Sequence, residues 1–328
     1  MNNIRLISRQ SLFTLLFLLC LSVVSSVQAQ LPELSHREGK LSVEAATLAG
    51  GFHSPLDSTP DPLGNTLYFV AVGKHGAGVF RVAAVADSPA VEIAGGTPFV
   101  APTGIVTSTD GTMLFIADAQ AWNASSSGQI FALPTSGGAP IPLPSAAGTK
   151  PQNLTVVMEN GVDVIYYTGR TIRSRQPAVF RLPVDSKIPA RVVAQGKPFV
   201  EPDGVAVTSN GEIYVADRAS AGNGRGHVFH IRGQNIRAIT SPTVMGNPAG
   251  IALMLDESEL LVSSYQRNGY DQVLIVDLKT LQTEVFKDVV GENIYAGGVH
   301  RAHERDVYSW AGNSFVGDGT VYVIRPRP

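Results

Sequence analysis

A segment that recurs along the chain constrains the fold more than any other feature of the sequence. Residues 96–104 (Gly-Thr-Pro-Phe-Val-Ala-Pro-Thr-Gly) and 196–204 (Gly-Lys-Pro-Phe-Val-Glu-Pro-Asp-Gly) lie 100 residues apart and agree at six of nine positions. Each is followed by a short apolar run, an Asp-Gly or Asn-Gly turn, and a second apolar run that ends in Ala-Asp. Short apolar runs between such turns are typical of β-strands joined by hairpins.

Weaker copies of the segment give the number of units. A proline anchor recurs every 46 to 51 residues, and an aromatic or leucine residue of the expected third strand recurs with the same period. The anchors are Pro55, Pro102, Pro151, Pro202, Pro248 and Ala296, and the third-strand residues are Phe80, Phe131, Phe180, Phe229, Leu274 and Tyr322. A unit of about 40–50 residues with four strands is a β-propeller blade. We therefore predict an all-β fold, a six-bladed β-propeller with four-stranded blades that start near residues 52, 99, 148, 199, 245 and 293.

The two ends of the repeat array predict how the ring closes. The sixth copy stops at its third strand, residues 320–324, and a strand-like segment, residues 41–47, precedes the first copy. This N-terminal strand is expected to complete the sixth blade, which leaves no open sheet edge. The propeller then spans residues 40–328, with residues 30–39 as a lead-in segment.

The first 29 residues have the pattern of a signal peptide. Arg5 and Arg9 form a positive start, residues 12–24 are apolar, and Ala29 is a small residue at the expected cleavage point. A transmembrane anchor is the alternative, but the apolar stretch is short for crossing a bilayer. We predict a secreted or periplasmic protein. Cys20 is the sole cysteine and lies in this segment, so disulfides and thiolate sites are not expected.

Charge and missing motifs narrow the classes of partner. Removal of Arg5 and Arg9 leaves 23 basic against 27 acidic residues, and the chain has no basic run. Nucleic acid, and a membrane after signal removal, are therefore not expected as partners. A nucleotide and haem are not expected either, because the sequence has no P-loop, and residues 222–226 lie between two strands. His300 and His303 are expected to face opposite ways along a strand. A monomer is expected.

Two sets of loops should open on one face of a propeller, and they supply the candidate site residues. Loops that enter the innermost strand carry His53, Asp57, Thr103, Gln152, Asn153 and Asp203. Loops after the second strand carry Asp118, Arg170, Asp217, Arg218, Tyr265 and Trp310. Carboxylates and an imidazole around a narrow channel mouth suit a hard cation or acid–base chemistry.

The repeat itself ranks these candidates. Asp118 and Asp217 share one repeat position, and an aspartate there has a structural alternative, since its side chain bonds nearby backbone N–H groups of a turn. Asp203 stands where other blades have Thr, Gln, Ala or Gly, and His53 has no counterpart elsewhere. Asp203 and His53 are therefore the predicted catalytic residues, and the other ten are predicted to bind ligand.

At the level of the repeat, the chain resembles NHL-type propellers, whose units read Pro-x-Gly-Ile-Ala, Asp-Gly and Val-Tyr-Val-Ala-Asp. It also resembles the senescence-marker-protein/gluconolactonase group, six-bladed proteins that hydrolyse lactones at a divalent metal in the channel mouth. Residues 52–55 (Phe-His-Ser-Pro) stand where that group has Gly-Glu-Ser-Pro, and Pro202-Asp203-Gly204 matches the segment of its metal aspartate.

The resemblance implies a divalent metal, either calcium, magnesium or zinc, held by Asp203, His53 and Gln152. His53 replaces the group's glutamate and Gln152 one of its two asparagines, while the other asparagine falls near Thr103. An imidazole ligand favours zinc-like ions over calcium or magnesium. A site that has lost its metal is the alternative.

Three functions follow from this pattern. The first is an exported propeller that binds a small polar organic ligand at the channel mouth and hydrolyses a lactone or ester with metal help. The second is a non-catalytic propeller that binds a protein or a glycan on the same face. The third is a lyase or cyclase of a secreted biosynthetic pathway.

Overall fold

The described part of the chain consists almost entirely of β-strands. The computed structural model describes residues 36–37, 41–123, 126–185, 187–265, 271–286, 295–313 and 318–327 of the 328-residue chain. The predicted signal peptide, residues 1–29, lies outside the described residues, and residues 35–328 form one structural unit. None of the described residues belongs to a helix of the length and apolar character that a membrane crossing requires.

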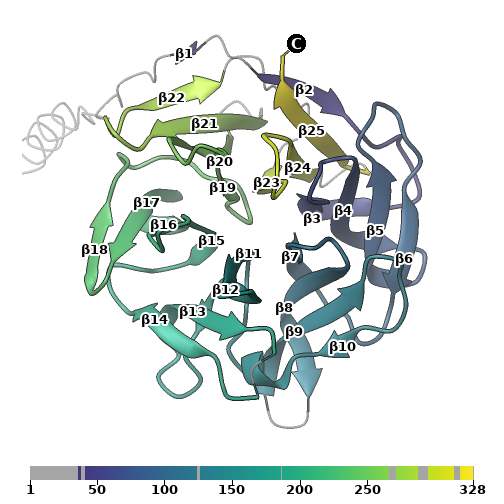
Figure 1. Ribbon diagram of the computed structural model, residues 1–328, viewed down its shortest axis with the longest axis horizontal. Helices are drawn as coiled ribbons and strands as arrows, with labels where there is room; N and C mark the ends of the chain where they lie inside the picture. The colour runs from purple at the N-terminus through teal and green to yellow at the C-terminus, as the bar shows by residue number, and fades with distance from the viewer. Residues whose placement is uncertain are drawn as a thin grey trace, which may run out of the picture. The chain divides into compact units, whose positions relative to one another are not determined.

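Six sheets follow one another around a ring, as predicted, and in each the inner strand of the sheet faces the central axis (Figure 1). Blade 1 contains β3 (His53–Pro60), β4 (Thr66–Gly73), β5 (Gly76–Ala83) and β6 (Val91–Gly95), and blade 2 contains β7 (Pro102–Thr107), β8 (Met113–Asn123), β9 (Ser126–Pro134) and β10 (Ile141–Pro142). Blade 3 contains β11 (Leu154–Glu159), β12 (Val162–Arg170), β13 (Pro177–Pro183) and β14 (Arg191–Gln195). A single 3₁₀ turn, η1 (Pro144–Ala146), precedes β11 in the described chain.

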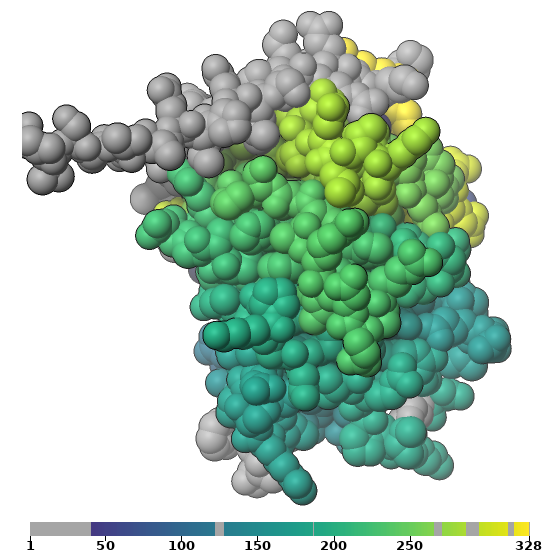
Figure 2. Space-filling model, turned by 90° about the vertical axis from the view of Figure 1, so that its left-hand side faces the viewer, coloured from purple at the N-terminus to yellow at the C-terminus, as the bar shows by residue number. Residues whose placement is uncertain are grey.

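The second half of the ring repeats this order. Blade 4 contains β15 (Pro202–Val207), β16 (Ile213–Gly222), β17 (Arg225–Arg232) and β18 (Asn235–Ala238). Blade 5 contains β19 (Ile251–Leu253), β20 (Glu259–Tyr265), β21 (Asp271–Asp277) and β22 (Thr283–Phe286), and blade 6 contains β23 (Tyr295–Arg301), β24 (Tyr308–Asn313), β25 (Thr320–Pro326) and β2 (Leu41–Ala45). These four-strand sets are antiparallel, and a side view shows blades 3, 4 and 5 following one another along the rim, from teal to yellow-green (Figure 2).

The N-terminal strand closes the ring, which confirms the prediction from the repeat. Strand β2 pairs antiparallel with β25, with Val43 opposite Ile324. A short strand, β1 (His36–Arg37), also pairs with β22 of blade 5, in parallel orientation. It lies within the segment expected to be a lead-in, and it covers backbone groups that the outer edge of blade 5 would otherwise leave unpaired.

The hydrophobic core lies between neighbouring blades. Between blades 1 and 2, for example, Val70, Ile105 and Leu114 pack together and are fully buried. Clusters of the same kind join blades 2 and 3, blades 3 and 4, blades 5 and 6, and blades 6 and 1. The third-strand aromatic residues of the repeat belong to these clusters, for instance Phe131 and Phe229. Burial between blades is therefore what the repeat of apolar positions encodes.

Candidate functional site

The central channel has an upper mouth, defined here as the end at which the chain enters the inner strands. A cavity of about 290 Å³ lies there, and every blade contributes to its wall. It is lined by Leu56, Thr103, Gln152, Asp203, Arg218, Asn247, Pro248, Tyr295 and Asn313. Four of the residues predicted from sequence thus meet in one cavity: Thr103, Gln152, Asp203 and Arg218.

The repeat explains why these residues meet. Leu56, Thr103, Gln152 and Asp203 each follow the anchor proline of their blade, and the anchor lies within three residues of the start of the inner strand. The next repeat position is usually glycine, because the neighbouring blade comes too close for a side chain. A Cβ on Gly204 would lie 2.4 Å from the carbonyl oxygen of Ala249 in blade 5. The blades therefore pack backbone to backbone below the anchors, and the variable side chains line the mouth above.

Asp203 and Arg218 form an ion pair in this cavity. Asp203 is 5% exposed, and its Oδ2 lies 3.0 Å from Nε of Arg218 and accepts a hydrogen bond of 3.2 Å from the backbone N–H of Ala249. Arg218 also pairs with Glu201 at 2.6 Å. Burial raises the pKa of Asp203 to about 7, against the opposing effect of Arg218. A carboxyl group that titrates near neutral pH inside a cavity is suited to acid–base chemistry.

Hydroxyl and amide groups surround the ion pair. The hydroxyl of Thr103 donates to the backbone carbonyl of Gln152 at 2.7 Å. Asn313 lines the opposite wall from blade 6, is 9% exposed, and its Oδ1 has no hydrogen-bond partner in the described part of the protein. A buried amide oxygen without a partner is unfavourable unless a ligand or water supplies a donor. The wall therefore offers charged, hydroxyl and amide groups to a ligand with several polar groups.

Asp118 and Asp217 do not line this cavity. Both are fully buried, and each accepts hydrogen bonds from backbone N–H groups of the loop that enters its blade. Asp118 accepts from Val100 and Ala101, and Asp217 from Val200 and Glu201, with distances between 2.7 and 3.2 Å. These hydrogen bonds agree with the structural role considered for the shared repeat position, in which the aspartate binds backbone N–H groups and stabilises a turn.

His53 lies apart from Asp203. Its side chain is exposed, and Nδ1 lies 3.3 Å from the hydroxyl of Ser54. The register of β3 against β4 shifts between His53 and Asp57, and Ser54 has a positive φ of 53°. This irregularity turns the chain before the anchor, so that Leu56, and not His53, lines the upper mouth.

Asp57 and Asn153 point into the channel below the upper mouth, where both are buried. Asp57 Oδ2 accepts from Nδ2 of Asn153 at 3.1 Å, from the backbone N–H of Ile105 at 2.8 Å, and from Nε2 of His300 at 3.1 Å. Both residues stand at the repeat position that is glycine in blades 2, 4, 5 and 6. Gly298 lies directly against Asp57. A Cβ at position 298 would lie 1.6 Å from Oδ1 of Asp57, so the absence of a side chain there leaves room for this carboxylate.

His300 is the residue that the sequence analysis missed. It stands where the other blades have Thr59, Val106, Thr155, Ala206 and Ala252, so departure from the repeat was a usable signal. The expectation that His300 and His303 face opposite ways was wrong. Strand β23 ends at Arg301, so strand alternation does not extend to His303, and both histidines line the same cavity at the other end of the channel.

The remaining candidates lie around the rim or in the core. Arg170 donates to the carbonyls of Arg175 and Val200, and the ring of Tyr265 contacts that of Tyr295 with centroids 6.3 Å apart. Trp310 was expected in a loop at the channel mouth, and that prediction was wrong. It is fully buried in the cluster between blades 5 and 6, because strand β24 directs it between the sheets.

The upper mouth does not fit the divalent metal that the resemblance implied. Asp203 is the one acidic side chain among the described residues that line it, and the guanidinium of Arg218 already neutralises that carboxylate. Nowhere in the described ranges do three His, Cys, Asp or Glu side chains gather closely enough to hold an ion. A cation at Asp203 would have to displace Arg218 and would find neutral oxygen ligands alone.

Comparisons with known proteins agree with this architecture. Residues 199–230, which include β15, β16 and most of β17, match the model of the NHL repeat. A comparison with curated proteins gives no match.

Solved structures of similar fold extend over most of the propeller. A gluconolactonase from Xanthomonas campestris is 16% identical, with 88% of this chain and 89% of that chain covered and a TM-score of 0.60. A Thermus thermophilus protein assigned as an oxidoreductase (glucose dehydrogenase) is 14% identical, with 87% and 99% covered and a TM-score of 0.58. A protein assigned as TolB from Agrobacterium tumefaciens is 16% identical, with 88% and 98% covered and a TM-score of 0.55. At these identities the likeness concerns the fold, and the chain is a six-bladed β-propeller whose fourth blade carries an NHL repeat.

Proposed function

We propose that the protein binds a small polyhydroxylated lactone in the upper mouth and hydrolyses it, with Asp203 as the acid–base group. The observation that carries this proposal is the buried pair of Asp203 and Arg218 in a cavity with walls from all six blades. A buried carboxyl group whose pKa is raised to about 7 is expensive for the fold, and such groups concentrate at functional sites.

The size and the lining of the cavity support this class of ligand. About 290 Å³ is at the small end of the range for organic ligands. The wall offers a hydroxyl from Thr103, amides from Gln152, Asn247 and Asn313, and the ion pair, which together match a molecule with a hydroxyl group on most carbon atoms. Two of the proteins with similar folds are named for glucose chemistry, a gluconolactonase and a glucose dehydrogenase.

The proposed reaction uses the chain's own residues. The carboxylate of Asp203 takes a proton from water, whose oxygen attacks the carbonyl carbon of the lactone. The guanidinium of Arg218 stabilises the negative charge that develops on the carbonyl oxygen. Collapse of the tetrahedral intermediate breaks the ring C–O bond, and Asp203 returns its proton to the leaving oxygen. Lactone and water thus give a hydroxy acid, whose carboxylate can pair with Arg218.

A panel of aldonolactones and aryl esters tests the proposal, with and without a metal chelator. Wild type is expected to hydrolyse at least one aldonolactone in the presence of chelator. Asp203→Asn is expected to lower kcat by about 10²-fold or more, the usual contribution of a general base. The matched control is Asp118→Asn, which changes a buried carboxylate at a turn and is expected to lower stability while kcat stays within about twofold.

Three outcomes would count against the proposal. Binding of an aldonate or lactone without turnover would leave a binding propeller and remove the hydrolase. Turnover that needs added calcium, magnesium or zinc would contradict the metal-free reaction. Equal losses of kcat in Asp203→Asn and Asp118→Asn would show that the upper mouth is not the reaction site.

We also propose export, on the signal-peptide pattern of residues 1–29. The test is mass spectrometry of the N-terminus of protein from a secreting host. A mature start at residue 30 supports export, and an intact first 29 residues would contradict it.

A further inference from the structure

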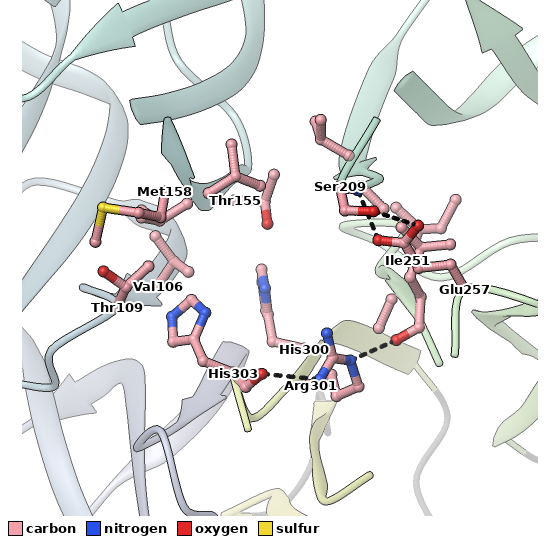
Figure 3. A pocket seen from close by; sticks show the side chains of 16 residues that line it. Val106, Thr109, Thr155, Met158, Ser209, Ile251, Glu257, His300, Arg301 and His303 are labelled. Carbon is pink, nitrogen blue, oxygen red and sulfur yellow. Dashed lines mark hydrogen bonds between the residues drawn. The ribbon is translucent and has the colours of Figure 1, made fainter. Parts of the chain in front are cut away.

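A second cavity, of about 320 Å³, lies at the opposite end of the channel, the lower mouth, where the inner strands end. Inner strands of blades 2 to 6 contribute to its wall. The rings of His300 and His303 are directed into it (Figure 3). The other inner strands present aliphatic or threonine side chains there, such as Val106, Thr155 and Ala252. The presence of two imidazole side chains in this largely aliphatic wall therefore requires a physical explanation.

The contacts of His300 determine which of its nitrogens carries a proton. Its Nε2 lies 3.1 Å from Oδ2 of Asp57, and that oxygen already accepts hydrogen bonds from Ile105 and Asn153. Because Oδ2 acts as an acceptor towards all three, Nε2 of His300 is the donor. In the neutral ring the lone pair is then on Nδ1, for which the described residues supply no hydrogen-bond partner.

His303 is fixed in the same tautomer by a different group. Its Nε2 lies 2.9 Å from the backbone carbonyl oxygen of Thr107, which can only accept, so Nε2 donates. In the neutral ring the lone pair is then on Nδ1, as in His300.

A histidine whose outer nitrogen donates to a carboxylate or to a backbone carbonyl is the usual arrangement around a metal ligand. His300 has the first of these partners and His303 has the second. Borderline-soft divalent ions such as zinc, cobalt and nickel prefer imidazole nitrogen.

The charges around the cavity are compatible with a cation. Glu257 lines the wall, and Asp57 lies directly behind His300. Asp163 lies beside the cavity, where it accepts hydrogen bonds from the backbone N–H and the hydroxyl of Thr109. Arg301 is the opposing charge, but its guanidinium is engaged by the backbone carbonyls of Leu253, Ala302 and His303 (Figure 3).

We propose that the lower mouth binds one divalent transition-metal ion through Nδ1 of His300 and Nδ1 of His303, with water completing the coordination. This site is separate from the upper mouth, and the inference does not rest on the proposed hydrolysis. With two protein ligands the site is expected to be exchangeable, and it would join strand β23 to the loop that follows it.

Titration of the untagged, metal-free protein with cobalt or zinc chloride tests the inference, by calorimetry and by the visible absorption of bound cobalt. One ion per chain is expected in wild type. His303→Gln and His300→Gln are each expected to weaken binding about tenfold or more, while His53→Gln and His75→Gln, exposed histidines elsewhere, leave it unchanged. His303→Gln tests the inference even if His300→Gln disturbs the network around Asp57.

Long-range ¹H–¹⁵N spectra of the imidazoles give a second readout without mutation. Protonated Nε2 and unprotonated Nδ1 are expected in both rings, and zinc should shift both Nδ1 resonances. No stoichiometric uptake, uptake unchanged in both variants, or an Nδ1–H tautomer in either ring would overturn the inference. Metal uptake that is lost in Asp203→Asn and kept in His303→Gln would instead place the ion at the upper mouth.

Discussion

Oδ2 of Asp57 lies 3.1 Å from Nε2 of His300, although 243 residues separate the two in the chain. Asp57 belongs to β3 of blade 1 and His300 to β23 of blade 6. The same oxygen accepts from Ile105 in blade 2 and from Asn153, which precedes β11 of blade 3. One fully buried carboxylate therefore joins four blades at the axis, between the two mouths of the channel.

Asp57→Asn is expected to destabilise the propeller by about 3 kcal/mol, because an amide presents donors to groups that are themselves donors, and buried networks that lose one partner typically cost about 3–5 kcal/mol. Urea unfolding followed by tryptophan fluorescence measures the change. Asp185→Asn, at an exposed turn, is the control and should stay within about 0.5 kcal/mol of wild type. Equal stability of the two variants would show that the axial network contributes nothing.

Ring closure through β2 is expected to be necessary for a stable fold. Removal of residues 1–48 takes away the outer strand of blade 6 and the buried side chain of Leu41, whose truncation alone would cost about 2–5 kcal/mol. Removal of residues 1–34, which lie outside the propeller unit, is the control and should leave the thermal transition unchanged. A cooperative transition at the same temperature in both truncated proteins would contradict closure by β2.

Asp271 is expected to make the protein less stable as pH rises. It is buried at the start of β21, and burial raises its pKa to about 8 against the opposing effect of the backbone N–H of Ala296. Between its ordinary pKa near 4 and 8 the folded state binds more protons than the unfolded state, so stability falls with rising pH across that window.

Asp271→Asn removes this dependence, so its unfolding free energy relative to wild type should increase between pH 5 and pH 8 by more than about 1 kcal/mol. Denaturant titrations at the two pH values measure it. A constant difference between the proteins would mean that Asp271 does not titrate in this window.

The sequence alone was sufficient for the fold and for part of the site. The period of the anchors and of the third-strand aromatics encodes blade packing, which is local and repeats, so the number of blades and the role of β2 followed from it. Thr103, Gln152 and Asp203 were found because their repeat position lines the mouth in blades 1 to 4.

The residues that were missed or misplaced depend either on contacts across the ring or on local strand geometry. Asp57 and His300 meet because blades 1 and 6 become neighbours on closure, a relationship that spacing within the repeat does not contain. His53 was chosen because it has no counterpart in the repeat and resembles the glutamate of the Gly-Glu-Ser-Pro segment, but the irregular start of β3 leaves it exposed to solvent. Trp310 was assigned to the loop after the second strand, but β24 (Tyr308–Asn313) includes it and its side chain is buried.

Arg218→Gln is expected to change both the affinity and the titration of the upper mouth. Loss of the guanidinium removes the charge that lowers the pKa of Asp203, so that pKa should rise above about 7. The variant should bind an aldonate more weakly by about tenfold, the loss of one charge-assisted hydrogen bond. Arg170→Gln, at the rim outside the cavity, is the control, and equal effects of the two would contradict the assignment of Arg218.

The dependence of kcat/KM on pH for aldonolactone hydrolysis tests the central claim most directly. If Asp203 is the base, the reaction needs its ionised form, so kcat/KM of wild type should rise tenfold per pH unit below about 7 and level off above it. In Arg218→Gln the same limb should move to higher pH, and in Asp203→Asn it should disappear together with most of the rate. A limb that keeps its position in Arg218→Gln, or persists in Asp203→Asn, would show that another group is the base and that the upper mouth is not the active site.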